Sequence, residues 1–186
     1  MSQWFLYFVF YSLGGYGLEK AFARATRAPK QVRKCFLLLP LCPVYGLAMT
    51  ALLAAAPPEL GFAGLILLGG AVCTAVEYAV HLFYDSLFRV QFWDYRPLRW
   101  HIQGRVCPQF SLVWGLLSAL AVRWVHPAIA AAADRIPAWA VFLIWMTLAA
   151  DCVFTAALLL RRRDPELLAI PAVWAQVRAS SQSSTS

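Results

Sequence analysis

Charged residues are scarce in this chain, and their scarcity excludes a soluble globular fold. Only 13% of the 186 residues are charged, whereas 61% are hydrophobic and 15% are aromatic. Soluble domains carry roughly 25% charged residues, and the core of a soluble domain of this length cannot hide so much apolar surface from water. Lipid is the solvent that fits this composition. We therefore expect an integral membrane protein built as one small unit.

Motifs for cofactor, metal and nucleotide chemistry are also missing. The five cysteines form no CxxC pair, and no HExxH, GxSxG or GxxxxGK[ST] sequence occurs. These absences leave no indication of a disulfide framework, a zinc site, a nucleophile elbow or a P-loop. The net charge of +7 accompanies no nucleic-acid recognition motif, so nucleic acid is not an expected partner. We expect no cofactor and no metal, and an enzyme is not the favoured class.

Five apolar runs of membrane length are what the chain contains instead. Each is near the ~20 residues that cross about 30 Å of hydrocarbon, and lipid favours helices because backbone groups find no partner in it. We predict an all-α integral membrane bundle of about five transmembrane helices. It would form a single domain over residues 1–166, followed by an interfacial helix over 167–178 and a disordered, Ser-rich tail over 179–186. The expected spans are Trp4–Phe22, Cys35–Ala56, Gly61–Tyr84, Val106–Val125 and Ala138–Leu160.

The distribution of basic residues predicts the orientation of these spans. Lys and Arg gather in residues 24–34, 89–105 and 161–163, whereas residues 57–59 contain none. Positive residues collect on the cytoplasmic side of a membrane. This places the N-terminus outside and the C-terminus inside an inner, cytoplasmic membrane. Membrane lipids with anionic headgroups are the expected partners of the basic clusters.

Acidic residues lie within the predicted spans, where a charge is costly and therefore informative. Glu77, His81 and Asp85 are spaced four apart, which places them on one helical face. Glu77 would lie roughly 24 Å from the outer start of its helix at ~1.5 Å per residue. Polar contacts that only hold helices together are the alternative to a functional cavity. The residues predicted to converge in a polar, inward-open cavity or a buried ionic network are Glu19, Glu77, Asp85, Asp151 and Arg105.

The stretch from Ser86 to Gly104 alternates aromatic residues with arginines and contains a proline. It is too polar to span the membrane and too apolar to lie free in water, so we predict an interfacial or partly re-entrant segment. Trp93, Tyr95 and Trp100 would lie at headgroup depth. Asp94 is expected to cap a turn or to pair with Arg105, and it joins the polar candidates. An aromatic belt without any further role is the alternative.

Six short motifs in this order and spacing resemble one family. They are YSLGGYGLE (Tyr11 to Glu19), LCPVYG (Leu41 to Gly46), VEY (Val76 to Tyr78), FWDY (Phe92 to Tyr95), GRVC (Gly104 to Cys107) and SLVWG (Ser111 to Gly115). Together they are similar to the bacterial family described as putative ABC-transporter type IV, and to small vertebrate multi-span proteins. The chain departs from the family pattern at three places. Asp85 stands where the family usually has a Glu, and His81 where an aromatic residue is common. Arg96, Pro97 and Leu98 follow the FWDY motif, where the family typically has a Ser and then a Pro-Phe pair.

The resemblance implies a multi-helix membrane protein labelled a permease, and three hypotheses stay open. In the first, the chain is an ABC-transporter permease-like component that needs a separate ATPase subunit and, because five spans make a small pathway, a homo-oligomer. In the second, it is a membrane-embedded enzyme or binding protein for a lipid or lipid-linked headgroup. Glu77 and Asp85 would then act as acid and base, and Arg105 would hold an anion. In the third, the chain is a structural or regulatory membrane protein.

Overall fold

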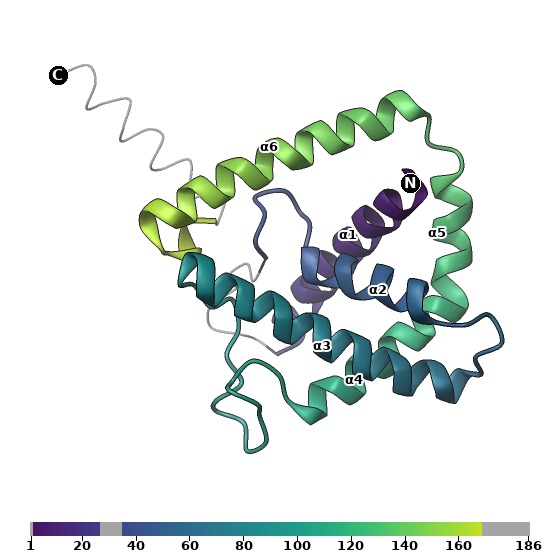
Figure 1. Ribbon diagram of the computed structural model, residues 1–186, viewed down its shortest axis with the longest axis horizontal. Helices are drawn as coiled ribbons and strands as arrows, with labels where there is room; N and C mark the ends of the chain where they lie inside the picture. The colour runs from purple at the N-terminus through teal and green to yellow at the C-terminus, as the bar shows by residue number, and fades with distance from the viewer. Residues whose placement is uncertain (1, 27–34, 169–186) are drawn as a thin grey trace.

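The computed structural model describes residues 2–26 and 35–168, and these residues are mostly helical (Figure 1). The elements are α1 (Ser2–Ala25), α2 (Pro43–Ala55), α3 (Phe62–Phe88), α4 (Pro108–Leu120), the π-helical turn η1 (Ala121–Val125), α5 (His126–Ala133), α6 (Ala138–Arg162) and the 3-10 turn η2 (Pro165–Leu168). The described residues contain no strand, only an isolated bridge between Ile102 and Val106. The prediction of an all-α membrane bundle is confirmed. Residues 169–178 of the predicted interfacial helix, and the predicted disordered tail over 179–186, lie outside the described residues.

Three helices among the described residues are long and apolar enough to cross a membrane. They are Phe62–Phe88, Pro108–Ala133 and Ala138–Arg162, where α4, η1 and α5 run on as one helix. The widened turn η1 lies just before Pro127, which has no N–H for the helical ladder and crowds the preceding turn. Helix α1 has 24 residues and α2 has 13. Each of these five helical segments overlaps one of the five predicted apolar runs. Helix α2 covers only part of its run, and the other four segments extend beyond theirs.

The second helix is shorter than the sequence predicts. We expected a helix from Cys35, but α2 begins at Pro43. Pro40 and Pro43 provide no N–H, and each disfavours helical geometry in the residue before it. Residues 35–42 therefore run as an irregular segment. This segment is nevertheless buried, since Leu37 is fully covered.

Asp151 of α6 satisfies the backbone of this irregular segment. Its Oδ1 accepts a hydrogen bond from the N–H of Leu38 at 3.2 Å, and its Oδ2 accepts one from the N–H of Leu39 at 2.9 Å. Non-helical backbone is tolerated at membrane depth only where protein groups satisfy it. The role of Asp151 in the described structure is thus to hold residues 38–39 against α6.

Helices α3 and α4 pack closely because small residues face each other. A Cβ on Gly115 would meet the backbone of α3, and a Cβ on Gly69 would meet the hydroxyl of Ser118. Thr74 Oγ1 also donates a hydrogen bond of 2.7 Å to Ser111 Oγ across the same interface. Small residues with hydrogen-bonding hydroxyls allow membrane helices to approach in this way. The close approach fixes the position of the residue beside Gly115, which is Trp114.

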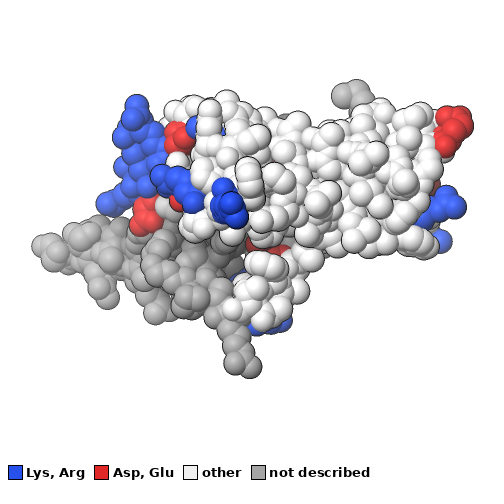
Figure 2. Space-filling view, turned by 90° about the horizontal axis from the view of Figure 1, so that it is seen from below, with Lys and Arg blue, Asp and Glu red and all other residues white. Residues whose placement is uncertain are grey.

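Charged residues lie toward the two ends of the bundle. In Figure 1, α3 and α6 end on the same side of the molecule, whereas the α2–α3 and α5–α6 connections lie on the opposite side. Figure 2 shows charged side chains toward both ends of one face, with a broad area of uncharged residues between them. A bundle that crosses a bilayer is expected to have this apolar band.

Candidate functional site

One face of α3 holds the loop that connects α3 to α4, residues 89–107. Glu77, His81 and Asp85 lie on this face, as their spacing predicted. Each of them contacts the loop through a polar atom. The contacts are Tyr95 Oη to Glu77 Oε1 at 2.7 Å, His81 Nε2 to the Trp93 carbonyl oxygen at 3.1 Å, and Arg105 Nη2 to Asp85 Oδ2 at 3.0 Å.

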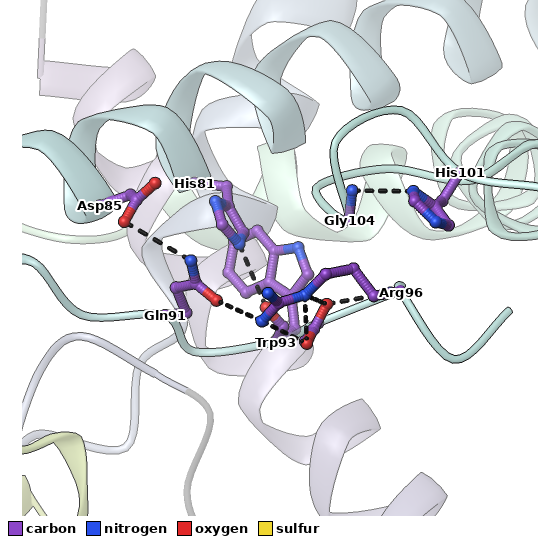
Figure 3. A network of polar contacts seen from close by, with 8 residues as sticks. His81, Asp85, Gln91, Trp93, Arg96, His101 and Gly104 are labelled. Atoms are coloured by element: carbon purple, nitrogen blue, oxygen red, sulfur yellow. Dashed lines mark hydrogen bonds and ion pairs between the residues drawn. The ribbon is translucent and has the colours of Figure 1, made fainter.

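The loop is shaped by a turn at Gly104, which has a φ of 73°. The Gly104 carbonyl accepts a hydrogen bond from the Tyr95 N–H at 2.8 Å, and its own N–H donates to His101 Nδ1 at 3.0 Å (Figure 3). A Cβ at this position would meet the side chains of Arg96 and Asp94. Glycine is therefore required both for the positive φ and for the close approach. The turn directs the Tyr95 side chain toward α3.

Asp94 caps a turn inside this loop. Its Oδ1 accepts a hydrogen bond from the Arg96 backbone N–H at 2.9 Å, and the Arg96 guanidinium lies 2.8 Å from Oδ2. The side-chain hydrogen bond from Arg96 holds the pKa of Asp94 below its usual range. Of the two predicted roles, capping is the one found. The ion-pair partner of Asp94 is Arg96 and not Arg105. Figure 3 shows the Arg96 side chain beside Gln91.

Arg105 forms an ion pair with Asp85. Besides the contact at 3.0 Å, its guanidinium lies 3.4 Å from the Tyr78 hydroxyl, 5.5 Å from the centre of the Tyr78 ring and in contact with Gln103 Oε1. The hydrogen bond to Asp85 raises the pKa of Arg105. The Arg105 side chain is 15% exposed and that of Asp85 33% exposed. Asp85 is thus neutralised by a permanent cation at the border of the loop.

Glu77 and Glu19 have tyrosine partners where Asp85 has an arginine. The Tyr45 hydroxyl donates to Glu19 Oε1 at 2.7 Å, the same distance at which Tyr95 donates to Glu77. Glu77 is only 7% exposed, and its Oε2 is buried without a well-aligned hydrogen bond among the described residues, although the Trp114 side chain lies beside the carboxylate. In the same part of the chain, no Lys or Arg forms an ion pair with either glutamate. Both carboxylates therefore lack a countercharge in direct contact.

Four aromatic rings join the two glutamate–tyrosine pairs. The Tyr45 ring meets the Trp114 ring edge to face at 5.5 Å, Phe110 lies 6.0 Å from Trp114, and Tyr95 stacks on Phe110 at 5.1 Å between centroids. Glu19 lies close enough to act electrostatically on both Glu77 and Tyr95. These six residues, Glu19, Tyr45, Glu77, Tyr95, Phe110 and Trp114, are called the carboxylate–aromatic site below.

Tyr95 is held as a hydrogen-bond donor by its surroundings. Burial raises the pKa of its hydroxyl, and the neighbouring carboxylates of Glu77 and Glu19 raise it further. The hydroxyl therefore keeps its proton over the physiological pH range. We predicted Tyr95 and Trp93 at headgroup depth, yet their polar atoms turn inward, since the Trp93 indole N–H donates to the Arg105 carbonyl at 2.9 Å. Trp100 differs from them in being 62% exposed.

The structure brings together only some of the five charged residues that were predicted to converge. Glu19 and Glu77 share the carboxylate–aromatic site, and Asp85 pairs with Arg105 about two turns further along α3. Asp151 bonds the backbone of residues 38–39 instead, so the prediction that it joins the same network is wrong. The sequence showed that Asp151 lies at membrane depth, but not that an irregular segment would need its oxygens.

Tyr45, Phe110 and Trp114 were not among the predicted site residues, although the sequence held a signal for two of them. Each of five motifs that carry the family resemblance supplies one residue to the carboxylate–aromatic site. These residues are Glu19 from YSLGGYGLE, Tyr45 from LCPVYG, Glu77 from VEY, Tyr95 from FWDY and Trp114 from SLVWG.

A separate apolar cleft of about 350 Å³ lies among α1, α2, α3, α6 and the irregular segment. Its lining includes Phe8, Phe36, Leu47, Val80, Phe83 and Leu148. Val80 and Phe83 lie on α3 outside the face formed by Glu77, His81 and Asp85. The cleft can therefore accept only an apolar group, and it is distinct from the carboxylate–aromatic site.

A comparison with protein families agrees with the resemblance seen in the motifs. A family model described as Putative ABC-transporter type IV matches residues 6–157. No curated protein and no solved structure matches the chain. The matched range covers most of the chain and contains the whole carboxylate–aromatic site. The chain therefore belongs to the putative ABC-transporter type IV family of membrane proteins.

Proposed function

We propose that this protein is a permease-like component of an ABC transport system in the inner membrane. In this proposal the carboxylate–aromatic site faces the cytoplasm and contacts the solute that the system moves. The observation that carries the proposal is the pair of carboxylates, Glu19 and Glu77, that lie on one aromatic wall without a contacting cation in the described structure.

The partners of the other acidic residues support a functional role for this pair. Asp85 is bound by Arg105, and both oxygens of Asp151 accept backbone hydrogen bonds. A carboxylate that only stabilises a fold is expected to use its oxygens in this way, because unpaired buried charge is costly. Glu77 has neither a cation nor a backbone N–H on its carboxylate among the described residues, only the Tyr95 hydroxyl and the neighbouring Trp114 side chain. Intramembrane ionisable groups that lack a structural explanation most often mark a substrate or ion pathway.

The depth of the site supports access from the cytoplasm. Glu77 follows the start of α3 by fifteen residues, or ~22 Å at ~1.5 Å per residue, and so lies toward the end of the helix that leads to the basic loop. The N-outside, C-inside orientation predicted from Lys and Arg places that end at the inner surface. A solute bound at Glu77 would then exchange with the cytoplasm over a short distance.

The chain would need partners to complete a pathway. It has no P-loop sequence, so ATP hydrolysis requires a separate ATPase subunit. Five helical segments enclose little space, and a second copy of the chain would enlarge the pathway. The basic loop over 89–105 and the end of α6 at Arg161 and Arg162 are the surfaces where a cytoplasmic subunit would dock.

The replacement Glu77→Gln tests the proposal because it removes charge and keeps size. The variant should reach the membrane at the wild-type level and keep its thermal midpoint, yet reproduce the metabolite profile of a deletion strain in comparative mass spectrometry of cells and medium. Glu59→Gln is the matched control, because Glu59 is exposed in the connection between α2 and α3. It should behave as wild type in both measurements.

Two results would contradict the transport proposal. A folded Glu77→Gln protein that keeps the wild-type metabolite profile would remove the role of the carboxylate. A Glu77→Gln protein that loses its thermal midpoint as strongly as a core variant would show that Glu77 holds the fold, as expected of a structural membrane protein.

Binding of a lipid or lipid-linked headgroup is a second candidate function, favoured by the apolar cleft. Its lining of aromatic and aliphatic side chains suits an acyl chain. Leu148→Trp would fill the cleft from α6. If the second function holds, this variant should lose co-purifying lipid, measured by mass spectrometry, while Glu77→Gln should lose turnover of that lipid.

A further inference from the structure

We infer that the carboxylate–aromatic site binds an alkylammonium group, that is, a protonated or quaternary amine. The inference rests on the proposed function, because it names the class of solute for the same site. Its starting point is the combination of two acidic side chains with a wall of aromatic rings, which share one location at membrane depth.

The charge of the site favours a cation. Glu19 lies close enough to act electrostatically on Glu77, and neither has an ion-pair partner among the described residues. Two carboxylates in such surroundings are stable only when protons or a cation compensate their charge. Glu77 Oε2 is buried and accepts no well-aligned hydrogen bond among those residues, with the Trp114 side chain beside the same carboxylate. It is the atom that a cation would contact. An anionic solute would meet two like charges and is disfavoured.

The aromatic rings favour an organic cation over a metal ion. Indole and phenol faces attract ammonium groups through the ring quadrupole, and Trp is the best of them. Trp114 lies between Tyr45 and Phe110, and Phe110 is followed by Tyr95. A hard metal ion would instead require several oxygen ligands around one point, and no group of three His, Cys, Asp or Glu suited to a metal occurs in the part of the chain that was described.

The tyrosine hydroxyls are compatible with this assignment because each of them occupies only one oxygen of its glutamate. Each donates to one oxygen of its glutamate at 2.7 Å and leaves the other oxygen for a further contact. An ammonium group could therefore bind Glu77 Oε2 while Tyr95 stays in place. The ammonium group could belong to a free amine or to the headgroup of a lipid, and the two sources share this chemistry.

Thermal stability of the purified full-length protein in detergent, measured with a set of probes, tests the inference. The probes are methylammonium, tetramethylammonium and choline, with dimethylbutanol as the uncharged analogue of choline and sodium chloride as the control for ionic strength. At least one ammonium probe should raise the thermal midpoint in a saturable way, whereas dimethylbutanol and sodium chloride should not. Equal shifts with choline and dimethylbutanol would overturn the inference, and so would the absence of a shift with every ammonium probe.

Variants of the site sharpen the same measurement. Glu77→Gln should weaken the apparent affinity for the probe at least about tenfold, because a charge-assisted contact is lost, and Glu59→Gln should leave it unchanged. Trp114→Leu should weaken it by a smaller factor, about threefold to tenfold, through the lost ring face. If Glu77→Gln does not fold, Glu19→Gln takes its place. Unchanged affinity in the folded glutamate variant would overturn the inference.

The lipid composition of nanodiscs distinguishes the two sources of the ammonium group, a lipid headgroup and a free amine. Protein in nanodiscs of phosphatidylethanolamine should lose the response to added methylammonium if the headgroup occupies the site, whereas nanodiscs of phosphatidylglycerol should preserve it. A response that persists in both assigns the site to a free amine.

Failure of this inference and failure of the transport proposal give different results. If no ammonium probe binds but Glu77→Gln still reproduces the deletion profile, the transport function stands and the solute class is wrong. If the probe binds but Glu77→Gln keeps the wild-type metabolite profile, the binding site stands and the transport function is wrong.

Discussion

Two kinds of acidic residue lie along one face of α3, and they differ in what neutralises them. Asp85 near the end of the helix pairs with the Arg105 guanidinium at 3.0 Å. Glu77, two turns earlier, has only neutral hydrogen-bonding neighbours: the Tyr95 hydroxyl donates to Oε1 at 2.7 Å, and the Trp114 side chain lies beside the same carboxylate. The first arrangement attaches the loop to the helix. The second leaves the Glu77 carboxyl group without a contacting cation, at a position where an ionised group is costly.

The difference separates stability from function. An ion pair with extra hydrogen bonds tolerates no loss of one partner, because the other is left with an uncompensated charge. A carboxylate held by a neutral tyrosine can lose its charge at little cost to the fold, since no cation is left behind. Substitutions at Asp85 or Arg105 should therefore lower the stability of the protein, whereas substitutions in the carboxylate–aromatic site should lower its activity.

The largest loss of stability is expected at Asp151, both of whose carboxylate oxygens accept backbone hydrogen bonds. Asp151→Ala removes the two hydrogen bonds that its oxygens accept from the N–H groups of Leu38 and Leu39, at a cost of up to about 1–3 kcal/mol for each buried bond. The irregular segment should detach from α6, and the thermal midpoint in detergent should fall strongly. Asp151→Asn keeps one acceptor oxygen and should lose less. A wild-type midpoint for the Ala variant would show that the segment is held by other contacts.

Removing Arg105 should give the next largest effect. Arg105→Gln leaves Asp85 without its cation and loses the contact with Tyr78, so the thermal midpoint should fall by several degrees. The double variant with Asp85→Asn should recover part of the loss, because the unpaired charge is gone. A double-mutant cycle measures this recovery. If the double variant were as unstable as the sum of the two single changes, Arg105 would not act through Asp85.

Tyrosine-to-phenylalanine changes should have a smaller effect on stability. Tyr95→Phe removes the hydrogen bond to Glu77 Oε1 and keeps the ring stacked on Phe110, at a cost of about 1 kcal/mol. Tyr45→Phe removes the matching bond to Glu19 and should cost a similar amount. Urea or thermal unfolding in the same detergent compares the two variants. A loss as large as that of Arg105→Gln would erase the distinction between the two regions.

The smallest effect is expected at the exposed pair of Asp94 and Arg96. The pKa of Asp94 is lowered in the folded protein, so its stabilisation is present above the unfolded pKa and is lost as pH falls through the lowered folded value. Asp94→Asn should therefore reduce the midpoint slightly at neutral pH and make no difference at a pH well below the usual range of a carboxyl group. A difference that persists in strong acid would indicate a contact other than the ionised pair.

Much of the fold follows from hydropathy alone, because a membrane allows few alternatives to a helix. The five apolar runs predict where the five helical segments lie, though not where each one ends, and the spacing of Glu77, His81 and Asp85 correctly places them on one face. The start of α2 was predicted wrongly because the positions of Pro40 and Pro43 do not show how many residues before them stay non-helical. Residues 35–42 stay buried without being helical only because Asp151, more than a hundred positions away, supplies the acceptors.

The candidate site was predictable in its acidic members and not in its aromatic ones. A glutamate inside an apolar run stands out, whereas Tyr45 and Trp114 resemble any other aromatic residue of a membrane helix. The inward direction of Tyr95 depends on the turn at Gly104, and the position of Trp114 depends on the close approach at Gly115. Both are long-range packing effects that no local pattern encodes. The family motifs were the one signal that named these positions together.

One comparison of thermal midpoints decides whether the fold needs the Glu77 carboxyl group. Glu77→Gln and Arg105→Gln are measured side by side in the same detergent at neutral pH. We expect Glu77→Gln to keep or raise the wild-type midpoint, because the replacement removes a buried carboxyl group that no cation contacts, whereas the midpoint of Arg105→Gln should fall by several degrees. An equal fall for the two variants would show that the fold depends on Glu77.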